Sequence, residues 1–332
     1  MSERLVHIEQ WLRQVIDAPS FDITPASNDA SFRRYWRVTF NGATRIVMDA
    51  PPDKEDCRPF IDVSSRLLDA GLNVPAVMER DLDLGFLLLT DLGNDLYLSM
   101  LNEDSVERLY GDAIERLLAI QADARAEGLP SYDRALLMQE MELFRVWLLG
   151  RELELELSLE QHAVLDRAFD FLAESALAQP RVFVHRDYHS RNLLVRAENN
   201  PGILDFQDAV WGPVTYDLVS LLRDCYVRWP PERVWRWALG YYEKAQVHGI
   251  MQGADQTTFL HWLDLMGVQR HLKASGIFAR LWHRDGKPSY LNDVPRTLGY
   301  IVEVSERYPE LADLQQLLVE RAIPAMENKI KT

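Results

Sequence analysis

The sequence has few cysteines and no long hydrophobic run, and each shortage excludes a class of protein. Only Cys57 and Cys225 occur in 332 residues, far apart in the chain, so we expect a reducing compartment and no disulfide framework. No apolar run reaches the length that spans a bilayer, and the first residues are charged and amphipathic, unlike an apolar signal segment. We therefore expect a soluble, cytoplasmic protein with no membrane partner.

Positive charge is scarce as well. The chain carries 36 lysines and arginines against 51 aspartates and glutamates, which gives a formal net charge of −15. Nucleic acids bind proteins through clustered basic side chains that neutralise phosphates, so no nucleic-acid partner is expected. The length and a hydrophobic fraction of 47% suffice for a large buried core, divided between about two lobes.

A polar stretch between short apolar runs, at residues 182–208, is the most informative part of the sequence. The apolar runs predict strands in a β-hairpin arrangement, and the turn-forming segment E-N-N-P-G separates the last two runs. The runs are residues 182–184, 193–195 and 203–204. Polar side chains stand at their ends: His185, Asp187, Asn192 and Asp205.

These polar side chains match a catalytic pattern. H-R-D-x-x-x-x-N, from His185 to Asn192, is the catalytic-loop pattern of protein kinases, and D-F-Q at Asp205 stands where those enzymes carry D-F-G. Phosphoryl transfer needs a carboxylate that accepts the proton of the attacking hydroxyl, which we assign to Asp187. It also needs oxygen ligands that hold Mg²⁺ beside the ATP phosphates, which we assign to Asn192 and Asp205.

Two plainer interpretations of the same stretch exist. The acids could lie in a solvated loop without chemistry, or His185 and His189 could bind zinc. That histidine spacing suits zinc on a helix, whereas the flanking apolar runs predict strands. The complete eight-residue pattern, followed closely by a strand that ends in Asp-Phe, favours phosphoryl transfer over both.

The second histidine, His189, is not typical of protein kinases. With it, the loop resembles the H-x-D-x-H-x-x-N pattern of the aminoglycoside phosphotransferase family, and the resemblance spans nearly the whole chain. Within this family the chain is most similar to bacterial sugar kinases of cell-wall recycling, which phosphorylate the anomeric hydroxyl of N-acetylmuramate and N-acetylglucosamine. Four stretches carry this closer resemblance: residues 29–38, 47–52, 188–195 and 278–291.

The resemblance implies an α+β, bilobal, protein-kinase-like fold. Residues 1–92 would form a small β-rich lobe with the nucleotide-phosphate loop and the hinge. Residues 93–332 would form a larger, mostly helical lobe with the catalytic loop and the acceptor site. The resemblance further implies ATP and Mg²⁺ as cofactors and a small amino sugar as the acceptor, and we expect a monomer.

The nucleotide site is expected in the first lobe. Asn41-Gly42 predicts a tight hairpin between strands at residues 35–40 and 44–50. By resemblance, the loop before this hairpin covers the ATP phosphates, although it lacks glycine and could be an ordinary solvated turn. Its residues are Asn28, Asp29, Ala30, Ser31, Phe32 and Arg33. By resemblance, the backbone also pairs with adenine where a buried strand ends, at Thr90, Asp91 and Leu92, although this segment could be a plain linker between the lobes.

A lysine is missing from the strand that returns from this hairpin. Protein kinases place a lysine there to bind phosphates, but this strand has Met48, and no lysine precedes Lys54. Another cation must replace it, and Arg33 and Arg45 are the two candidates. With no lysine to neutralise, Glu55 is expected to be a solvated acid.

Further candidates belong to the acceptor site and to the support of the loop. A carboxylate such as that of N-acetylmuramate favours an arginine, which can engage it through two hydrogen bonds. The acceptor candidates are Asp208, Trp211, Arg223, Arg270 and His283. Asp217 opens an amphipathic helix, and by resemblance it hydrogen-bonds the backbone of the catalytic loop, which His185 also supports. A plain helix cap is the alternative for Asp217.

Helix signals are clear elsewhere. Apolar residues at helical spacing predict helices at residues 4–16 and 59–68. Two pairs predict capped helix starts in the second lobe, Asp104 with Glu107 and Ser158 with Gln161.

Three rival functions stay open at this point. A kinase of a cationic small molecule, such as an aminoglycoside or choline, would fit the negative charge. A nucleotide-binding scaffold without catalysis would explain the missing lysine, but the complete Asp187, Asn192 and Asp205 set argues against it. A protein kinase would need an activation segment, for which residues 205–217 are too short.

Overall fold

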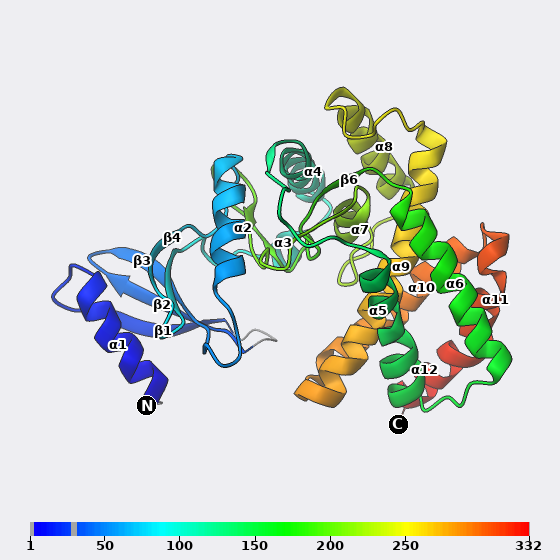
Figure 1. The fold of residues 1–332 in the computed structure, drawn as a ribbon, viewed down its shortest axis with the longest axis horizontal. Coiled ribbons are helices and arrows are strands. Elements are labelled where there is room, and N and C mark those ends of the chain that lie inside the picture. Colours follow the sequence, from blue (N-terminus) through cyan, green and yellow to red (C-terminus); the bar gives the residue numbers. More distant parts are fainter. Residues whose placement is uncertain (1–2, 28–31, 332) are drawn as a thin grey trace.

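The computed structural model describes residues 3–27 and 32–331, which form two lobes (Figure 1). The small lobe holds a five-stranded antiparallel sheet with the strand order β1-β2-β3-β5-β4. Its strands are β1 Asp22–Ser27, β2 Arg34–Phe40, β3 Ala43–Asp49, β4 Val77–Asp81 and β5 Phe86–Thr90. The hairpin predicted at Asn41-Gly42 is confirmed, because both residues have the positive φ that such a tight turn requires.

Two helices cover the two faces of this sheet (Figure 1). Successive side chains of a strand point to opposite faces, so the buried strands carry apolar residues on both. Val47 and Leu88 pack with α1 Glu3–Val15, whereas Met48 packs with α2 Arg58–Asp69. Both helices lie where their apolar spacing predicts them.

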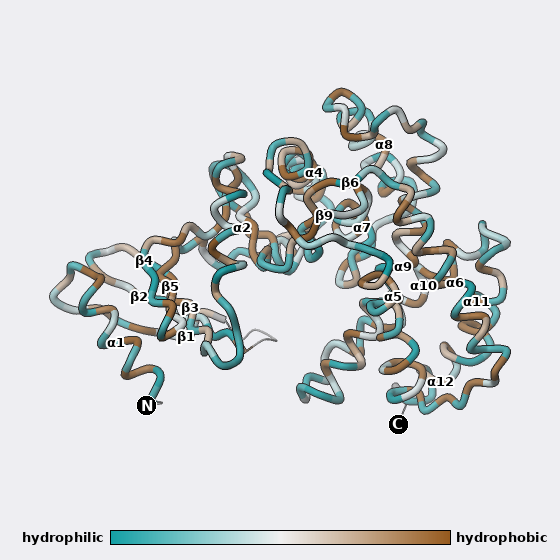
Figure 2. Tube along the Cα trace, in the orientation of Figure 1, coloured by the Kyte–Doolittle hydropathy of each residue, from teal (hydrophilic) through white to brown (hydrophobic). Residues whose placement is uncertain are grey.

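The large lobe is mostly helical, and its core runs across the helices, whose sequences all contain hydrophobic positions (Figure 2). Its α-helices are α3 Tyr97–Met100, α4 Val106–Asp123, α5 Arg134–Leu143, α6 Leu159–Leu177, α7 Tyr216–Leu222, α8 Pro231–Val247, α9 Gln256–Asp285, α10 Val294–Ser305, α11 Ala312–Leu317 and α12 Ile323–Lys331. The π-helical segments are η1 Phe144–Glu152 and η4 Leu318–Ala322, and the 3-10 helices are η2 Pro288–Asp293 and η3 Pro309–Leu311.

Helix α9, 30 residues long, runs through this lobe and contacts α5, α6, α7, α10 and η1. Gly276 allows its closest approach to another backbone. A Cβ atom at Gly276 would lie 2.3 Å from the carbonyl carbon of Leu143, where α5 passes into η1. This close backbone packing at Gly276 fixes the position of the side chains that α9 directs toward the catalytic loop.

The strands around the catalytic loop pair differently from the predicted hairpin arrangement. The first apolar run forms β6 Arg181–Val184, which pairs with β9 Val210–Pro213. The other two runs form β7 Leu193–Leu194 and β8 Gly202–Ile203, which pair with each other as expected. The strand β9 escaped prediction because it is four residues long and contains glycine and proline. The catalytic loop therefore connects two small antiparallel ladders.

One predicted helix cap is confirmed and one is wrong. Ser158 and Gln161 form a complete capping box at the start of α6. Asp104 does not cap α4, because that helix begins at Val106 and the Asn102 side chain accepts the amide hydrogen bonds of the preceding turn. In the described part of the chain, no helix has the length and apolarity that a membrane crossing demands.

Candidate active site

The structure brings the three predicted phosphoryl-transfer residues together. Asp187 follows β6, Asn192 precedes β7, and Asp205 follows β8. The Asn192 side-chain amide donates to the Asp187 carbonyl at 3.0 Å and lies 3.4 Å from a carboxylate oxygen of Asp205. The Leu204 amide donates to the Asn192 carbonyl, which ties the two strand ends together. Asn192 and Asp205 are therefore the side chains that would hold a cation at this point.

The ligands available at this point suit a hard cation. Carboxylate and amide oxygens are preferred by Mg²⁺, which usually shares its coordination with substrate phosphates. Among the described residues, no group of three or more histidines, cysteines and acids is arranged to hold a metal by itself. Asn192 and Asp205 therefore suit Mg²⁺ that nucleotide phosphates would also bind. Zinc held by His185 and His189 is not supported.

The backbone is strained at two residues of the catalytic region, Arg186 and Asp205. Arg186 and Asp205 both lie in the left-handed region, with φ of 79° and 61°, although neither is glycine. Such conformations persist only where the surroundings enforce them, and they concentrate at functional sites. Gln207 donates a hydrogen bond to Asp205 at 2.8 Å and so helps to hold its carboxylate.

Asp217 holds the catalytic loop, as the resemblance implied. Its carboxylate accepts hydrogen bonds from the amides of His185 at 2.6 Å and Arg186 at 2.9 Å. Burial raises the pKa of Asp217 to about 7, although these two amides act in the opposite direction. The His185 ring accepts from the Asp187 amide, and burial lowers the pKa of His185 to about 4, so the ring is neutral near pH 7.

A buried ionic cluster lies beneath the catalytic loop, and sequence reasoning missed it. The Glu140 carboxylate on α5 accepts hydrogen bonds from Arg186 and Tyr132 and lies 3.1 Å from the Lys273 ammonium on α9. Lys273 also donates to the Tyr216 hydroxyl at 2.8 Å. No local pattern marks Glu140 or Lys273, because each lies on an otherwise ordinary helix.

The cations of this buried cluster lower the pKa of the predicted catalytic base, Asp187. Burial opposes the ionisation of Asp187, yet the nearby positive charges, with Lys273 the strongest, hold the pKa of Asp187 below its usual range. Arg186 and Arg270 act in the same direction. The Asp187 side chain is nevertheless 39% exposed, so the carboxylate is ionised and open to an incoming hydroxyl.

The small lobe contributes an arginine to this site. Arg33 pairs with Glu55 at 3.1 Å, and its charge interacts with Asp205 and Asp208 across the lobes. The expectation of a solvated Glu55 is wrong, because its side chain is only 17% exposed. Met48 lies in the core, where it cannot replace a lysine. The loop residues 28–31 lie outside the described part of the chain, and Phe32 after them is exposed.

The hinge residues are tightly held. Asp91 makes two hydrogen bonds with Arg37, at 2.6 and 3.1 Å, and these bonds lower its pKa although burial opposes the shift. The Thr90 hydroxyl accepts from the Ala76 amide, and the Leu92 carbonyl accepts from Arg196. The Thr90 hydroxyl, the Asp91 carboxylate and the Leu92 main-chain carbonyl are thus all engaged within the protein.

The acceptor candidates separate into two groups. Asp208 is exposed and shares the Gln207 amide with Asp205, and the charge of buried Arg270 interacts with Asp187, so the structure places these two candidates near the catalytic loop. Two of the other three candidates, Arg223 and His283, are each paired with an acid. The guanidinium of Arg223 is neutralised by Asp264 at 2.6 Å, and the His283 imidazole lies 2.7 Å from Glu152.

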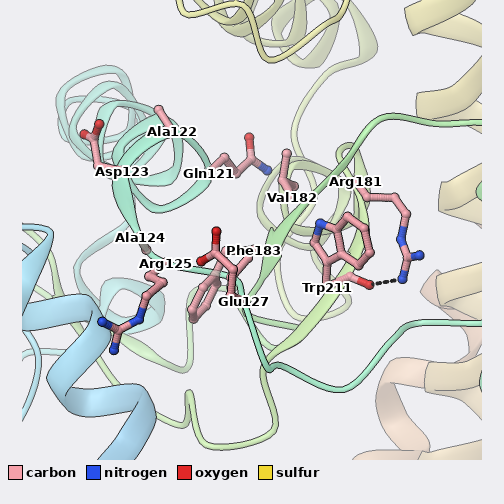
Figure 3. Close-up of a pocket in the computed structure, with 11 residues that line it drawn as sticks. Gln121, Ala122, Asp123, Ala124, Arg125, Glu127, Arg181, Val182, Phe183 and Trp211 are labelled. Atoms are coloured by element: carbon pink, nitrogen blue, oxygen red, sulfur yellow. Dashed lines mark hydrogen bonds between the residues drawn. The ribbon is translucent and has the colours of Figure 1, made fainter.

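Trp211 lies in a different place altogether. Its ring stacks under the Arg181 guanidinium, 3.8 Å from the ring centre, and lines a surface hollow of about 530 Å³ (Figure 3). This hollow contains none of Asp187, Asn192 and Asp205. Trp211 therefore stays a prediction for the acceptor site.

The comparison with known proteins decides the family. A family model described as the phosphotransferase enzyme family matches residues 22–252, which include the sheet and the catalytic loop. The chain belongs to this family. It is therefore an enzyme that transfers phosphate, and the prediction of this family from the catalytic-loop pattern is confirmed.

Several relatives of this phosphotransferase share a name. A protein of Pseudomonas putida named N-acetylmuramate/N-acetylglucosamine kinase is 51% identical, over 96% of this chain and 96% of the relative. A protein of Neisseria meningitidis with the same name is 44% identical, again over 96% of each chain. One from Pseudomonas aeruginosa is 50% identical, over 91% of this chain and 89% of the relative.

Solved structures confirm the predicted α+β, bilobal, protein-kinase-like fold of the phosphotransferase. The choline kinase of Streptococcus pneumoniae superposes with a TM-score of 0.62, covering 91% of this chain and 100% of the other. The GDP complex of aminoglycoside 2'-phosphotransferase-IIIa superposes with a TM-score of 0.61, covering 92% and 99%. Identities of 13% and 16% limit both likenesses to the fold.

Proposed function

We propose that this phosphotransferase is an ATP- and Mg²⁺-dependent sugar kinase of cell-wall recycling that phosphorylates the anomeric hydroxyl of N-acetylmuramate, N-acetylglucosamine or both. One observation carries the proposal: Asp187, Asn192 and Asp205 meet at one point in a chain that is 51% identical to a kinase named for these two sugars. The relatives at 50% and 44% identity support the same acceptors.

In the proposed reaction, Asp187 orients the sugar hydroxyl and accepts its proton. The hydroxyl oxygen forms a bond to the γ-phosphorus while the bond between that phosphorus and the β-γ bridging oxygen breaks, so that ADP leaves. Asn192 and Asp205 would hold Mg²⁺, which when bound neutralises negative charge on the phosphates. The main chain at residues 90–92 would contact adenine, and the loop at residues 28–33 would cover the phosphates.

A direct assay tests the function. With Mg-ATP and a mixture of N-acetylmuramate, N-acetylglucosamine, choline and kanamycin, we expect phosphate to appear on the two amino sugars, and chelation of Mg²⁺ to stop the transfer. Mass spectrometry and phosphorus NMR identify the product and the phosphorylated oxygen. Phosphate on choline or kanamycin alone would favour a kinase of cationic acceptors, and no transfer at all would favour a nucleotide-binding scaffold.

Arg33 is the proposed replacement for the missing lysine. Its guanidinium lies on the small lobe, is held by Glu55, and interacts with Asp205 and Asp208. We expect Arg33→Ala to raise the KM for ATP about tenfold or more, because a charge-assisted contact to phosphate is lost. Steady-state kinetics with varied ATP at saturating sugar measure the effect.

Two further variants are compared with Arg33→Ala. Arg58, on the same lobe, is 79% exposed and pairs with Asp56 at 3.6 Å, so Arg58→Ala should leave the KM for ATP unchanged. Arg45→Ala tests the second candidate from the sequence. An unchanged KM for ATP in both the Arg33 and the Arg45 variants would remove both arginines from the nucleotide site.

A further inference from the structure

Several cations on the helices and loops around the active site are paired with acids, but two arginines of α9 have no acid within 4 Å among the described residues: Arg270, which is buried and donates to the Cys225 Sγ, and Arg280. The pairs are Arg186 and Lys273 with Glu140, Arg223 with Asp264, Arg284 with Asp285, and Arg296 with Asp293. Within residues 3–27 and 32–331, no carboxylate lies within 4 Å of the Arg280 guanidinium and no acceptor takes a hydrogen bond from it.

Arg280 is on the active-site side of its helix. It follows Lys273 by seven residues, which is about two helical turns, so both side chains leave the same face of α9. Lys273 contacts Glu140 and acts on Asp187, and Arg280 also interacts with Glu140. In Figure 1 the C-terminal half of α9 runs toward the side of the large lobe that faces the sheet.

The surroundings of Arg280 suit the binding of an anion. The side chain is half-buried, and its Nε atom is excluded from solvent without a hydrogen-bond partner among the described residues. Burial and the neighbouring Arg284 lower the pKa of Arg280, while Asp285 and Glu140 act in the opposite direction. A partly buried polar group without a partner costs stability, and a bound carboxylate would remove that cost through two parallel hydrogen bonds.

The two acceptors of the proposed function differ by one anion. N-acetylmuramate carries a lactyl carboxylate that N-acetylglucosamine lacks, whereas in the proposed function Arg33 and a cation held by Asn192 and Asp205 would meet the ATP phosphates. We propose that Arg280 binds the lactyl carboxylate of N-acetylmuramate and makes the enzyme prefer this sugar over N-acetylglucosamine. This inference rests on the proposed function, and it names a specificity residue within that site.

The two sugars test this proposal inside one enzyme. We expect Arg280→Ala to lower kcat/KM for N-acetylmuramate about tenfold or more, mainly through KM, and to leave kcat/KM for N-acetylglucosamine within about twofold. Activity on N-acetylglucosamine also shows that the variant is folded. For Arg280→Lys we expect a kcat/KM for N-acetylmuramate between those of the wild type and of Arg280→Ala, because an ammonium keeps the charge but loses the planar double contact.

Control variants separate this proposal from its rivals. Arg284→Ala removes an exposed arginine one turn away that is already paired with Asp285, and it should leave the ratio of the two sugars unchanged. Arg191→Ala tests another arginine of the large lobe, which stacks on Tyr226 at 3.8 Å. An equal loss for both sugars, no loss in Arg280→Ala, or a selective loss in Arg191→Ala alone would overturn the proposal. A wild type that turns over neither sugar would instead overturn the proposed function and this inference with it.

Discussion

Replacing Asp187 by Asn should leave a folded enzyme that binds ATP and transfers phosphate at least about a hundredfold more slowly. The amide of Asn keeps the size of the side chain but cannot accept the proton of the sugar hydroxyl. The Asp187 backbone amide still donates to the His185 ring, and its carbonyl still accepts from Asn192, so the loop stays in place. The kcat at saturating ATP and sugar measures the loss.

The pH profile and a control sharpen this expectation. Because Lys273 and the nearby arginines hold the pKa of Asp187 below its usual range, the base is fully ionised at neutral pH, and kcat should not titrate with it there. The matched change Asp313→Asn removes an acid that is 64% exposed in a surface pair with Arg167, and it should leave kcat unaltered. Full activity of the Asp187→Asn enzyme would exclude Asp187 from the mechanism.

The catalytic loop could be predicted from the sequence because its information is local. His185, Asp187 and Asn192 occur within eight residues, and the short apolar runs beside them indicate strands whose ends are close in space. The hairpin at Asn41-Gly42 and the capping box of α6 are equally local. At such positions a few neighbouring residues determine the backbone, so the pattern carries over directly into structure.

The ionic cluster could not be predicted because it joins distant parts of the chain. Glu140 and Arg186 are 46 residues apart, and Lys273 comes from a third segment. In the sequence, each looks like an exposed charged residue on a helix or loop, and only the packing of α5 on α9 buries them. The pair of Arg33 with Glu55 escaped prediction for the same reason.

The acceptor candidates show a second limit of sequence reasoning. The residue types of Trp211 and His283 favour a ligand site, but a residue type does not determine which way its side chain points. Trp211 stacks under Arg181, and His283 lies against Glu152. Arg280 lies three residues before His283, and its lack of an acidic partner appears only when every nearby carboxylate has been placed.

The second large effect is expected from Glu140→Gln. Glu140 is 4% exposed and neutralises two cations, Arg186 and Lys273, that are themselves largely buried. Without its charge, both cations keep their desolvation cost and repel each other, so the free energy of unfolding should fall by about 3–5 kcal/mol. Thermal and urea unfolding measure this change, and an unaffected unfolding midpoint would show that the cluster does not stabilise the fold.

A double variant distinguishes loss of charge balance from loss of packing. In Glu140→Gln with Lys273→Met, one of the two uncompensated cations is gone, so the double variant should be more stable than Glu140→Gln alone. The surface change Glu303→Gln, which breaks an exposed pair with Arg228, should cost less than about 1 kcal/mol. The double variant should nevertheless transfer phosphate poorly, because Lys273 is the strongest positive charge that holds Asp187 in its ionised form. Recovery of stability without recovery of activity would thus assign the cluster two separate roles, one in balancing buried charge and one in setting the charge of the catalytic base.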